Sequence, residues 1–227
     1  MKEVWKGIWE NRGSDVQDYS YESLLKINGY DGAQSIITPD TLYPAINRYE
    51  REMRIERGDS IYEVGCGAGA ALYHWERMGY EVGGCDLSGN LINVAKTAIP
   101  KGSWDVCEAV KIPVKPSYDH VIAFGVFFYF ANYEYAKDVL YRMIMKAKRS
   151  VSIFDIPDLS KMQACENFRR SLIPDYDEKY KGMTHLYYAK SWWIGTLNDL
   201  GLSFNIYDQA IEGYENGNYR YNVTIRL

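Results

Sequence analysis

The sequence has few cysteines and no long apolar run, and both shortages narrow its class. Its 227 residues include four cysteines, with no C-x-x-C pair, a pattern typical of reduced thiols in a cytoplasm and not of a disulfide framework. The longest apolar run, residues 121–131, has 11 residues, well short of the ~20 that span a bilayer. The N-terminal stretch also lacks the apolar segment of a signal peptide. We therefore expect a cytoplasmic protein without a membrane segment.

Histidines are scarce too, and neither sign of charge dominates. The histidines, His74, His120 and His185, share no spacing with cysteines or carboxylates that resembles a metal site, so we expect no metal. The formal net charge of −4 does not suggest a phosphate backbone as partner, because that would normally require a basic face. The chain is expected to act on a small molecule, without nucleic acid or membrane, as a monomer or homodimer.

Tyrosine, in contrast, is abundant. There are 21 tyrosines, and eight of them fall between positions 176 and 221. Because tyrosine combines an apolar ring with a polar tip, such a cluster is expected either to line a pocket for a polar small molecule or to form a wet, amphipathic surface. Composition does not choose between the two.

Short β-rich runs alternate with segments of helical spacing from about residue 60 onward. Strands are predicted over residues 60–64, 80–85, 104–107, 119–124 and 150–155, with helices over 68–78, 88–98 and 136–147. The last two strands, 202–208 and 219–227, are joined by a linker too short for a parallel crossover and should be antiparallel. We therefore predict an α/β fold: a Rossmann-like, doubly wound, mostly parallel seven-stranded sheet with an antiparallel C-terminal strand and an N-terminal helical lid.

One domain is expected, in four parts. Residues 1–58 form a helical N-terminal cap, 59–156 a cofactor-binding core, 157–190 a substrate-covering insertion, and 191–227 the final helix and antiparallel strand pair. The insertion is long for an α/β connection, and it leaves the sheet at the carboxyl end, where ligands bind in such folds.

The most informative segment is Glu63-Val-Gly-Cys-Gly-Ala-Gly-Ala70, at a strand-to-helix junction. Its glycines allow the backbone to approach a ligand, and the next strand ends in Asp86, whose carboxylate can accept both hydroxyls of a ribose. The spacing also satisfies the G-x-G-x-x-A pattern of a dinucleotide site. Glu63 opposes that reading, since dinucleotide sites usually have an apolar residue there and a carboxylate suits an ammonium group.

Several segments together resemble the class I S-adenosylmethionine-dependent methyltransferases over about residues 59–156. The glycine segment resembles the first motif of that family, and Asp86-Leu87-Ser88 followed by Ala95 resembles its second-strand signature. The segment from Glu108-Ala109 to Ile112-Pro113 is similar to an acidic-Ala-x-x-Leu-Pro motif. Residues 119–129 are similar to the fourth-strand motif, with Phe128 and Tyr129 in place of its usual histidine pair.

The resemblance implies a cofactor, S-adenosylmethionine, and a role for each matching residue. Glu63 would orient the methionine ammonium, Asp86 would hold the ribose hydroxyls, and Glu108 would meet the adenine amino group. The other cofactor-binding candidates are Gly65, Cys66, Gly67, Gly69, Leu87, Ala109 and Phe124. The side chain of Cys66 is expected to be packed and not to act as a nucleophile.

The catalytic candidates are His185, which lies in the insertion above the expected cofactor, and Tyr129, which ends the fourth-strand motif. A neutral imidazole can take a proton from an acceptor hydroxyl, although a loop histidine can equally serve only structure. The candidates for binding substrate are Tyr19, Tyr21, Asp155, Tyr187, Tyr188 and Arg220. Arg169 and Arg170 could receive a phosphate or carboxylate, but a solvated basic face is the more common role for such a pair.

The predicted function is methyl transfer from S-adenosylmethionine to an oxygen or nitrogen of a small polar metabolite, such as a sugar or an intermediate of a surface-polysaccharide or natural-product pathway. Two alternatives stay open. One is a nucleic-acid or protein methyltransferase, and the other is a module that binds S-adenosylmethionine without catalysis.

Overall fold

The computed structural model describes residues 3–13, 15–32 and 37–227. Its strands are β1 (Ser60–Val64), β2 (Glu81–Asp86), β3 (Ser103–Val106), β4 (Tyr118–Phe124), β5 (Ala147–Pro157), β6 (Ser203–Asp208) and β7 (Arg220–Arg226). Its α-helices are α1 (Glu3–Glu10), α2 (Tyr21–Ile27), α3 (Pro39–Met53), α4 (Ala70–Arg77), α5 (Gly89–Ala98), α6 (Tyr133–Lys146), α7 (Met162–Leu172), α8 (Tyr176–Lys179) and α9 (Lys190–Asp199). Short 3-10 turns are η1 (Ala109–Lys111), η2 (Phe127–Tyr129), η3 (Leu159–Lys161) and η4 (Glu215–Tyr219).

The strands form one seven-stranded sheet in the order β3-β2-β1-β4-β5-β7-β6. Strands β1 to β5 pair in parallel, and β7 pairs antiparallel with both β5 and β6. The predicted mostly parallel sheet with an antiparallel C-terminal pair is therefore confirmed.

Successive side chains of the central strands enter two different cores, one on each face of the sheet. Ile61 packs with α2, α3, α4 and α5 on one face, whereas Tyr62 packs with α6 and α9 on the other. Ile122 and Val121 divide in the same way on β4. This alternation is the period of two expected for a strand with both faces covered, and it explains why these strands read as continuous apolar runs.

Helix starts follow from capping side chains. The Ser88 hydroxyl accepts from the backbone N–H of Leu91 at 3.3 Å and begins α5. Thr38 and Thr41 form a capping box at the start of α3, with Pro39 at its first position. Side-chain oxygens at these positions satisfy N–H groups that the helix itself leaves unpaired.

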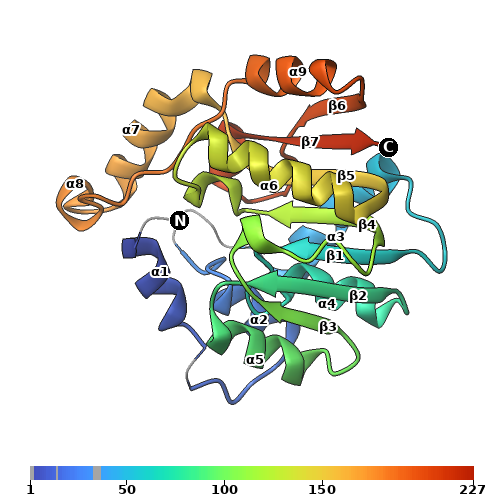
Figure 1. The fold of residues 1–227 in the computed structure, drawn as a ribbon. Coiled ribbons are helices and arrows are strands. Elements are labelled where there is room, and N and C mark those ends of the chain that lie inside the picture. The colour runs from blue at the N-terminus through green and yellow to red at the C-terminus, as the bar shows by residue number, and fades with distance from the viewer. Residues whose placement is uncertain (1–2, 14, 33–36) are drawn as a thin grey trace.

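The parallel strands all end at the same side of the sheet, where α1, α7 and α8 gather (Figure 1). Helix α1, in the N-terminal part, packs against α5, where Asn90 donates its side-chain N–H to the carbonyl of Glu10 at 2.7 Å. Helices α7 and α8 belong to the segment that follows β5. Elements from two distant parts of the sequence thus enclose the carboxyl end of the sheet, where ligands bind in folds of this kind.

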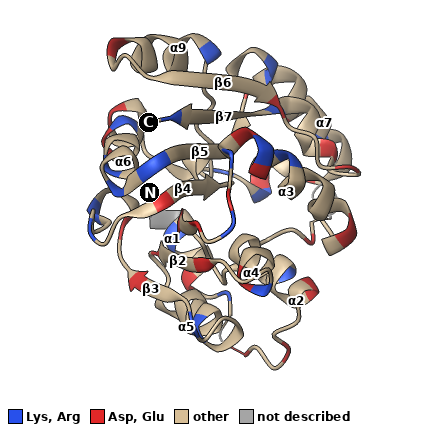
Figure 2. Cartoon of the chain, turned by 90° about the vertical axis from the view of Figure 1, so that its right-hand side faces the viewer, with Lys and Arg blue, Asp and Glu red and all other residues tan. Residues whose placement is uncertain are grey.

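Charges of both signs are spread over the described elements. On the side shown in Figure 2, Lys and Arg positions are interspersed with Asp and Glu positions. Among the described helices, none is long and apolar enough to cross a membrane.

Candidate active site

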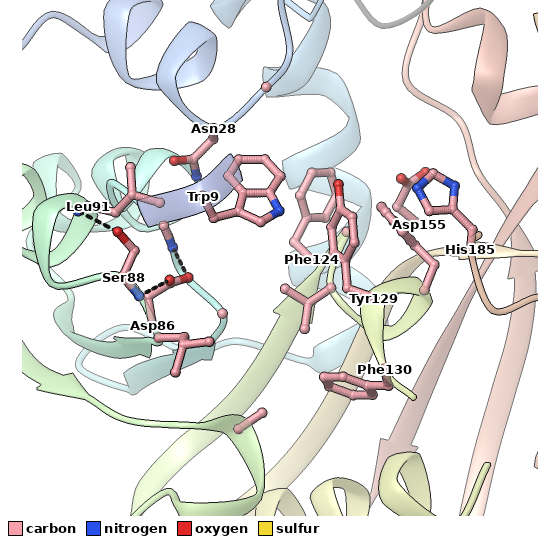
Figure 3. A pocket seen from close by; sticks show the side chains of 18 of the residues that line it. Trp9, Asn28, Asp86, Ser88, Leu91, Phe124, Tyr129, Phe130, Asp155 and His185 are labelled. Atoms are coloured by element: carbon pink, nitrogen blue, oxygen red, sulfur yellow. Dashed lines mark hydrogen bonds between the residues drawn. The ribbon is translucent and has the colours of Figure 1, made fainter. Parts of the chain in front are cut away.

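One cavity of about 290 Å³ lies at the carboxyl end of the parallel strands. Figure 3 shows Asp86 at one end of it and Asp155 and His185 at the other, with Phe124 and Tyr129 between them. We name the two ends after the roles that the sequence predicts for them, and the end at Asp86 and the glycine loop, residues 65–69, is called the cofactor half. The end at Asp155 and His185 is called the acceptor half.

The glycine loop has its own N–H groups already bonded within the protein. The N–H groups of Gly65 and Cys66 both donate to the carbonyl of Cys85, at 2.8 and 2.9 Å, and that of Gly69 donates to the carbonyl of Cys66 at 2.9 Å. The remaining two donate to side chains: Gly67 to Asp86 at 2.9 Å and Ala68 to Asn28 at 2.7 Å. A pyrophosphate needs free N–H donors at such a loop, so this loop is unsuited to a dinucleotide.

Glycine is required at two positions of this loop by backbone conformation and by space. Gly65 has φ +74°, and a Cβ there would lie 2.2 Å from a methyl carbon of Val126. Gly67 has φ +55°, and its Cβ would lie 2.5 Å from the side-chain oxygen of Asn28. Both backbones are left-handed, a conformation that other residues adopt at a cost. The loop can therefore keep its shape only with glycine at both positions.

Asp86 holds the loop and faces the cavity at the same time. One carboxylate oxygen accepts from Gly67 and the other from the N–H of Ser88, each at 2.9 Å. Burial raises the pKa of this carboxyl above its usual value, and hydrogen bonds from the backbone N–H groups of Ser88, Gly67 and Leu87 act in the opposite direction. Each oxygen keeps acceptor capacity, so the carboxylate can receive two hydroxyls from a ligand.

Glu63 lies under the loop and not in the cavity wall. It is 2% exposed, and one of its carboxylate oxygens has no hydrogen-bond partner among the described residues. Burial, reinforced by the charge of Asp86, raises the pKa of Glu63 well above its usual range. An unpaired buried carboxylate is costly, and a cationic group placed nearby would relieve that cost.

The other residues predicted to bind cofactor divide into two groups. Six of them line the cavity: Gly65, Gly67, Leu87, Glu108, Ala109 and Phe124. Cys66 and Gly69 do not. Cys66 is fully buried against Gly84 of β2, as expected for a packed thiol, and Gly69 faces Ile99 and Trp104. The start of α4 also lies outside the cavity lining, so its N–H groups do not serve this site.

A bulge in β5 brings Asp155 into the acceptor half. Pairing between β5 and β7 shifts register between Ile153 and Ile156, and Asp155 in this bulge has φ +63°. Its carboxylate oxygens accept from the Tyr214 hydroxyl at 2.9 Å and from Gln209 at 3.3 Å. A left-handed non-glycine residue beside a cavity is typical of functional sites.

His185 lies in the acceptor half, as predicted, in contact with Arg169. The Arg169 guanidinium and Nδ1 of His185 are 2.9 Å apart. Because a guanidinium only donates, Nδ1 accepts and the proton of the neutral ring lies on Nε2. His185 also stacks on Trp5, with ring centroids 5.1 Å apart. Proton uptake at Nδ1 therefore requires Arg169 to turn away.

Tyr129 and Arg220 also line the cavity. Burial raises the pKa of the Tyr129 hydroxyl, although Arg220, Arg169 and Arg12 act in the opposite direction. Tyr129 is consequently a neutral phenol near pH 7, able to donate or to offer its ring but not to act as a phenolate. Arg169, expected on a solvated face, lines the cavity too, whereas Arg170 does not.

Four tyrosines predicted to bind substrate lie outside the cavity lining. Tyr188 is fully buried, and its hydroxyl donates to the carbonyl of Phe127 at 2.8 Å. Tyr187 lies beside the buried thiol of Cys165, Tyr19 donates to the carbonyl of Val16, and Tyr21 stacks on Tyr73. Their amphipathic rings serve packing, with the polar tip of Tyr19 and of Tyr188 on the backbone.

The lining residues that the sequence did not single out include Trp9, Asn28 and Tyr30. Trp9 comes from α1, and the spacing of Trp5, Ile8 and Trp9 is a helical pattern that could have been recognised. Asn28 follows α2, accepts from Ala68 and donates to the carbonyl of Cys66 at 3.1 Å. No local pattern distinguishes such an asparagine from an ordinary helix end.

No group of three or more histidine, cysteine or carboxylate side chains that could hold a metal ion occurs within residues 3–13, 15–32 and 37–227.

A family model described as a methyltransferase domain matches residues 62–148. This segment runs from β1 into β5 and includes the glycine loop, Asp86 and Tyr129. No curated protein matches the chain in sequence.

Solved structures of methyltransferases share the fold of nearly the whole chain. One is the magnesium protoporphyrin IX methyltransferase of Synechocystis PCC 6803 with bound S-adenosylhomocysteine, at 14% identity and a TM-score of 0.64, covering 99% of this chain and 94% of that one. Another is the plantazolicin methyltransferase BpumL with a desmethylplantazolicin analogue and S-adenosylhomocysteine, at 14% identity and a TM-score of 0.66, covering 99% and 96%. A third is a putative S-adenosylmethionine-dependent methyltransferase from Listeria monocytogenes, at 15% identity and a TM-score of 0.59, covering 83% and 99%.

The class predicted from the sequence is confirmed by the domain match and the fold. The chain carries a methyltransferase domain over residues 62–148 and has the class I methyltransferase fold. The cofactor of this class is S-adenosylmethionine.

Proposed function

We propose that this protein transfers the methyl group of S-adenosylmethionine to an oxygen or nitrogen of a small polar metabolite, such as a natural-product intermediate. The observation that carries the proposal is the single cavity whose two ends differ in chemistry. The cofactor half offers a shaped backbone loop and a carboxylate, and the acceptor half offers charged and aromatic side chains.

The cofactor half fits S-adenosylmethionine on its own chemistry. Asp86 has the acceptor capacity for two ribose hydroxyls, and Glu108 and Ala109 line the cavity beyond it. The unpartnered oxygen of Glu63 suits a cationic amino group, reached directly or through water. The N–H groups of the glycine loop are already bonded, which fits a ligand without phosphate there.

S-adenosylmethionine supplies an electrophilic methyl group on a sulfonium. The protein then has to align the acceptor atom with that methyl group and accept a proton if the acceptor is a hydroxyl. Phe124 and Tyr129, between the two halves, provide aromatic walls that suit a sulfonium. His185 can take the acceptor proton at Nδ1 once the Arg169 guanidinium has turned away from that atom.

The shape of the site favours a small acceptor over a macromolecule. The cavity is lined by α1 on one side and by residues of α7 and the following segment on the other. We take this enclosure of the cavity by two elements as support for a small acceptor over a protein or nucleic-acid strand.

Calorimetry and a methyl-transfer assay test the proposal together. Calorimetry should show that S-adenosylmethionine and S-adenosylhomocysteine bind and that nicotinamide dinucleotides do not. Radiolabelled methyl groups should then appear on small acceptors from an extract of the source cells, in the fraction below the size of proteins and nucleic acids. Preferred binding of a dinucleotide would refute the proposal, and cofactor binding without any labelled product would indicate a non-catalytic module.

A further inference from the structure

Two arginines in the acceptor half lack a carboxylate partner. Arg220 is the first residue of β7 and is 2% exposed, and Arg169 lies on α7. Both line the cavity. No ion pair joins either guanidinium to a carboxylate in the part of the chain that the structure describes. A fully buried arginine such as Arg220 is almost always paired, and Arg169 is partly buried.

The bonding of Arg220 is sparse for a buried guanidinium. One terminal nitrogen donates to the carbonyl of Asp155 at 3.4 Å, and the group lies 4.7 Å from the centre of the Phe128 ring. Its Nε has no acceptor among the described residues. A guanidinium carries five N–H donors, and the bond to Asp155 uses only one of them.

Arg169 contrasts with its neighbour on the same helix. Arg170 points outward and is 3.0 Å from a carboxylate oxygen of Asp177 and 3.5 Å from one of Glu166. Arg169 instead contacts the neutral ring of His185 inside the cavity. Consecutive residues of a helix point about 100° apart, as follows from 3.6 residues per turn. The helix therefore places one arginine at the surface and the other at the site.

The carboxylates near Arg169 and Arg220 do not neutralise the positive charge of the two guanidinium groups. Asp155 is the carboxylate of this half, and its oxygens accept from Tyr214 and Gln209. Lys6 and Glu10, which also line the cavity, lie 3.9 Å from each other. The acceptor half therefore carries more positive than negative charge, between the aromatic walls of Phe128 and Tyr129.

We propose that Arg169 and Arg220 form an anion-binding subsite, so that the natural acceptor carries a carboxylate or a phosphate group. The proposal rests on the proposed function in assigning this half of the cavity to the acceptor. An anion bound to Arg169 would also draw its guanidinium away from His185 and leave Nδ1 able to accept a proton. Recognition of the acceptor and readiness of the base would then be linked through one side chain.

Three probes of similar shape test the subsite: benzoate, phenyl phosphate and benzyl alcohol. Each is titrated into the protein loaded with S-adenosylhomocysteine, and again into the protein alone, with binding followed by NMR. At least one anion should bind ten-fold or more tightly than benzyl alcohol, and the comparison of benzoate with phenyl phosphate identifies the preferred anion. Equal binding of all three probes, or no binding of either anion, would overturn the proposal.

The variants Arg220→Gln and Arg169→Gln each remove one charge, and Arg170→Gln is the matched control. The first two should lower anion affinity at least ten-fold and leave binding of S-adenosylhomocysteine unchanged, while the control keeps wild-type affinity for both. Circular dichroism shows whether each variant folds. Because Arg169 lies outside the sheet, Arg169→Gln still tests anion binding if Arg220→Gln fails to fold. An equal loss in Arg170→Gln would mean that general surface charge attracts the probes. Failure of S-adenosylhomocysteine to bind wild type would count against the proposed function alone, because the anions are also measured without it.

Discussion

The two halves of the cavity are built by different means. The cofactor half is mostly backbone: a loop of five residues whose N–H groups are all bonded within the protein. The acceptor half is assembled from side chains of η2, β5, α7, the segment after α8 and β7. A backbone site is encoded by neighbouring residues, whereas a side-chain site depends on how distant segments pack. We therefore expect substitutions in one half to change cofactor affinity and those in the other to change turnover.

The largest effect is expected at the glycine loop. Gly67→Val should abolish cofactor binding, because the added Cβ would meet Asn28 at 2.5 Å on a left-handed backbone. Gly89→Val is the matched control, since a Cβ at that glycine has no neighbour within 4 Å. Calorimetry checks both. Wild-type cofactor affinity in a folded Gly67→Val protein would show that the loop is only a turn.

The next effect tests the acceptor half. His185→Ala should lower kcat about 10²–10⁴-fold, the usual span for loss of a general base, and leave cofactor affinity unchanged. In wild type, kcat should fall as pH drops, because protonation removes the lone pair that the base requires, and this limb should be absent from the variant. A variant whose pH profile matches that of wild type would leave His185 as a support for Arg169 only.

A smaller effect is expected at Asp86. Asp86→Ala should weaken cofactor binding by about 1.5–3 kcal/mol, as for loss of hydrogen bonds to a charged group, with kcat at saturating cofactor little changed. Burial raises the pKa of this carboxyl, so the affinity of wild type should fall as pH drops through that raised pKa and the carboxylate becomes protonated. Titrations across pH would contradict this role if wild type and variant changed in parallel.

The smallest effect concerns stability. The pKa of Glu63 is raised by burial, so between the unfolded and the raised folded pKa the native state binds more protons than the unfolded chain. The free energy of unfolding should therefore decrease as pH rises through that window. Glu63→Gln should flatten this slope and raise stability at neutral pH, with weaker cofactor binding. Chemical denaturation at several pH values measures the free energy of unfolding. Glu81→Gln, which removes an exposed carboxylate, is the control in which the slope with pH should persist.

This contrast between the halves also explains what the sequence could predict. The first strand, residues 60–64, was placed with its exact ends, because apolar pattern and flanking turn residues are local signals. The cofactor half could be predicted for the same reason: Gly65 follows β1 directly and Asp86 ends β2, so their spacing is fixed by the chain.

The acceptor half was predicted less completely. Asp155, His185 and Arg220 do line the cavity, but Tyr187 and Tyr188 pack elsewhere, since a tyrosine ring suits a core whenever its hydroxyl reaches a backbone carbonyl. Arg169 and Arg170 are indistinguishable by type. Which of them enters the cavity depends on the rotation of α7 against the sheet, and that is decided by tertiary packing.

Helix α1 is expected to affect the rate of turnover as well as the shape of the cavity. It supplies Trp9 to the cavity wall and is attached through Asn90 to the carbonyl of Glu10 and through Arg12 to the carbonyls of Lys26 and Ile27. These are few and partly exposed bonds, of the kind that open locally without global unfolding. We expect the exchange of cofactor and product to depend on such local opening of α1. Opening of α1, and not the methyl transfer itself, is therefore expected to limit the turnover rate.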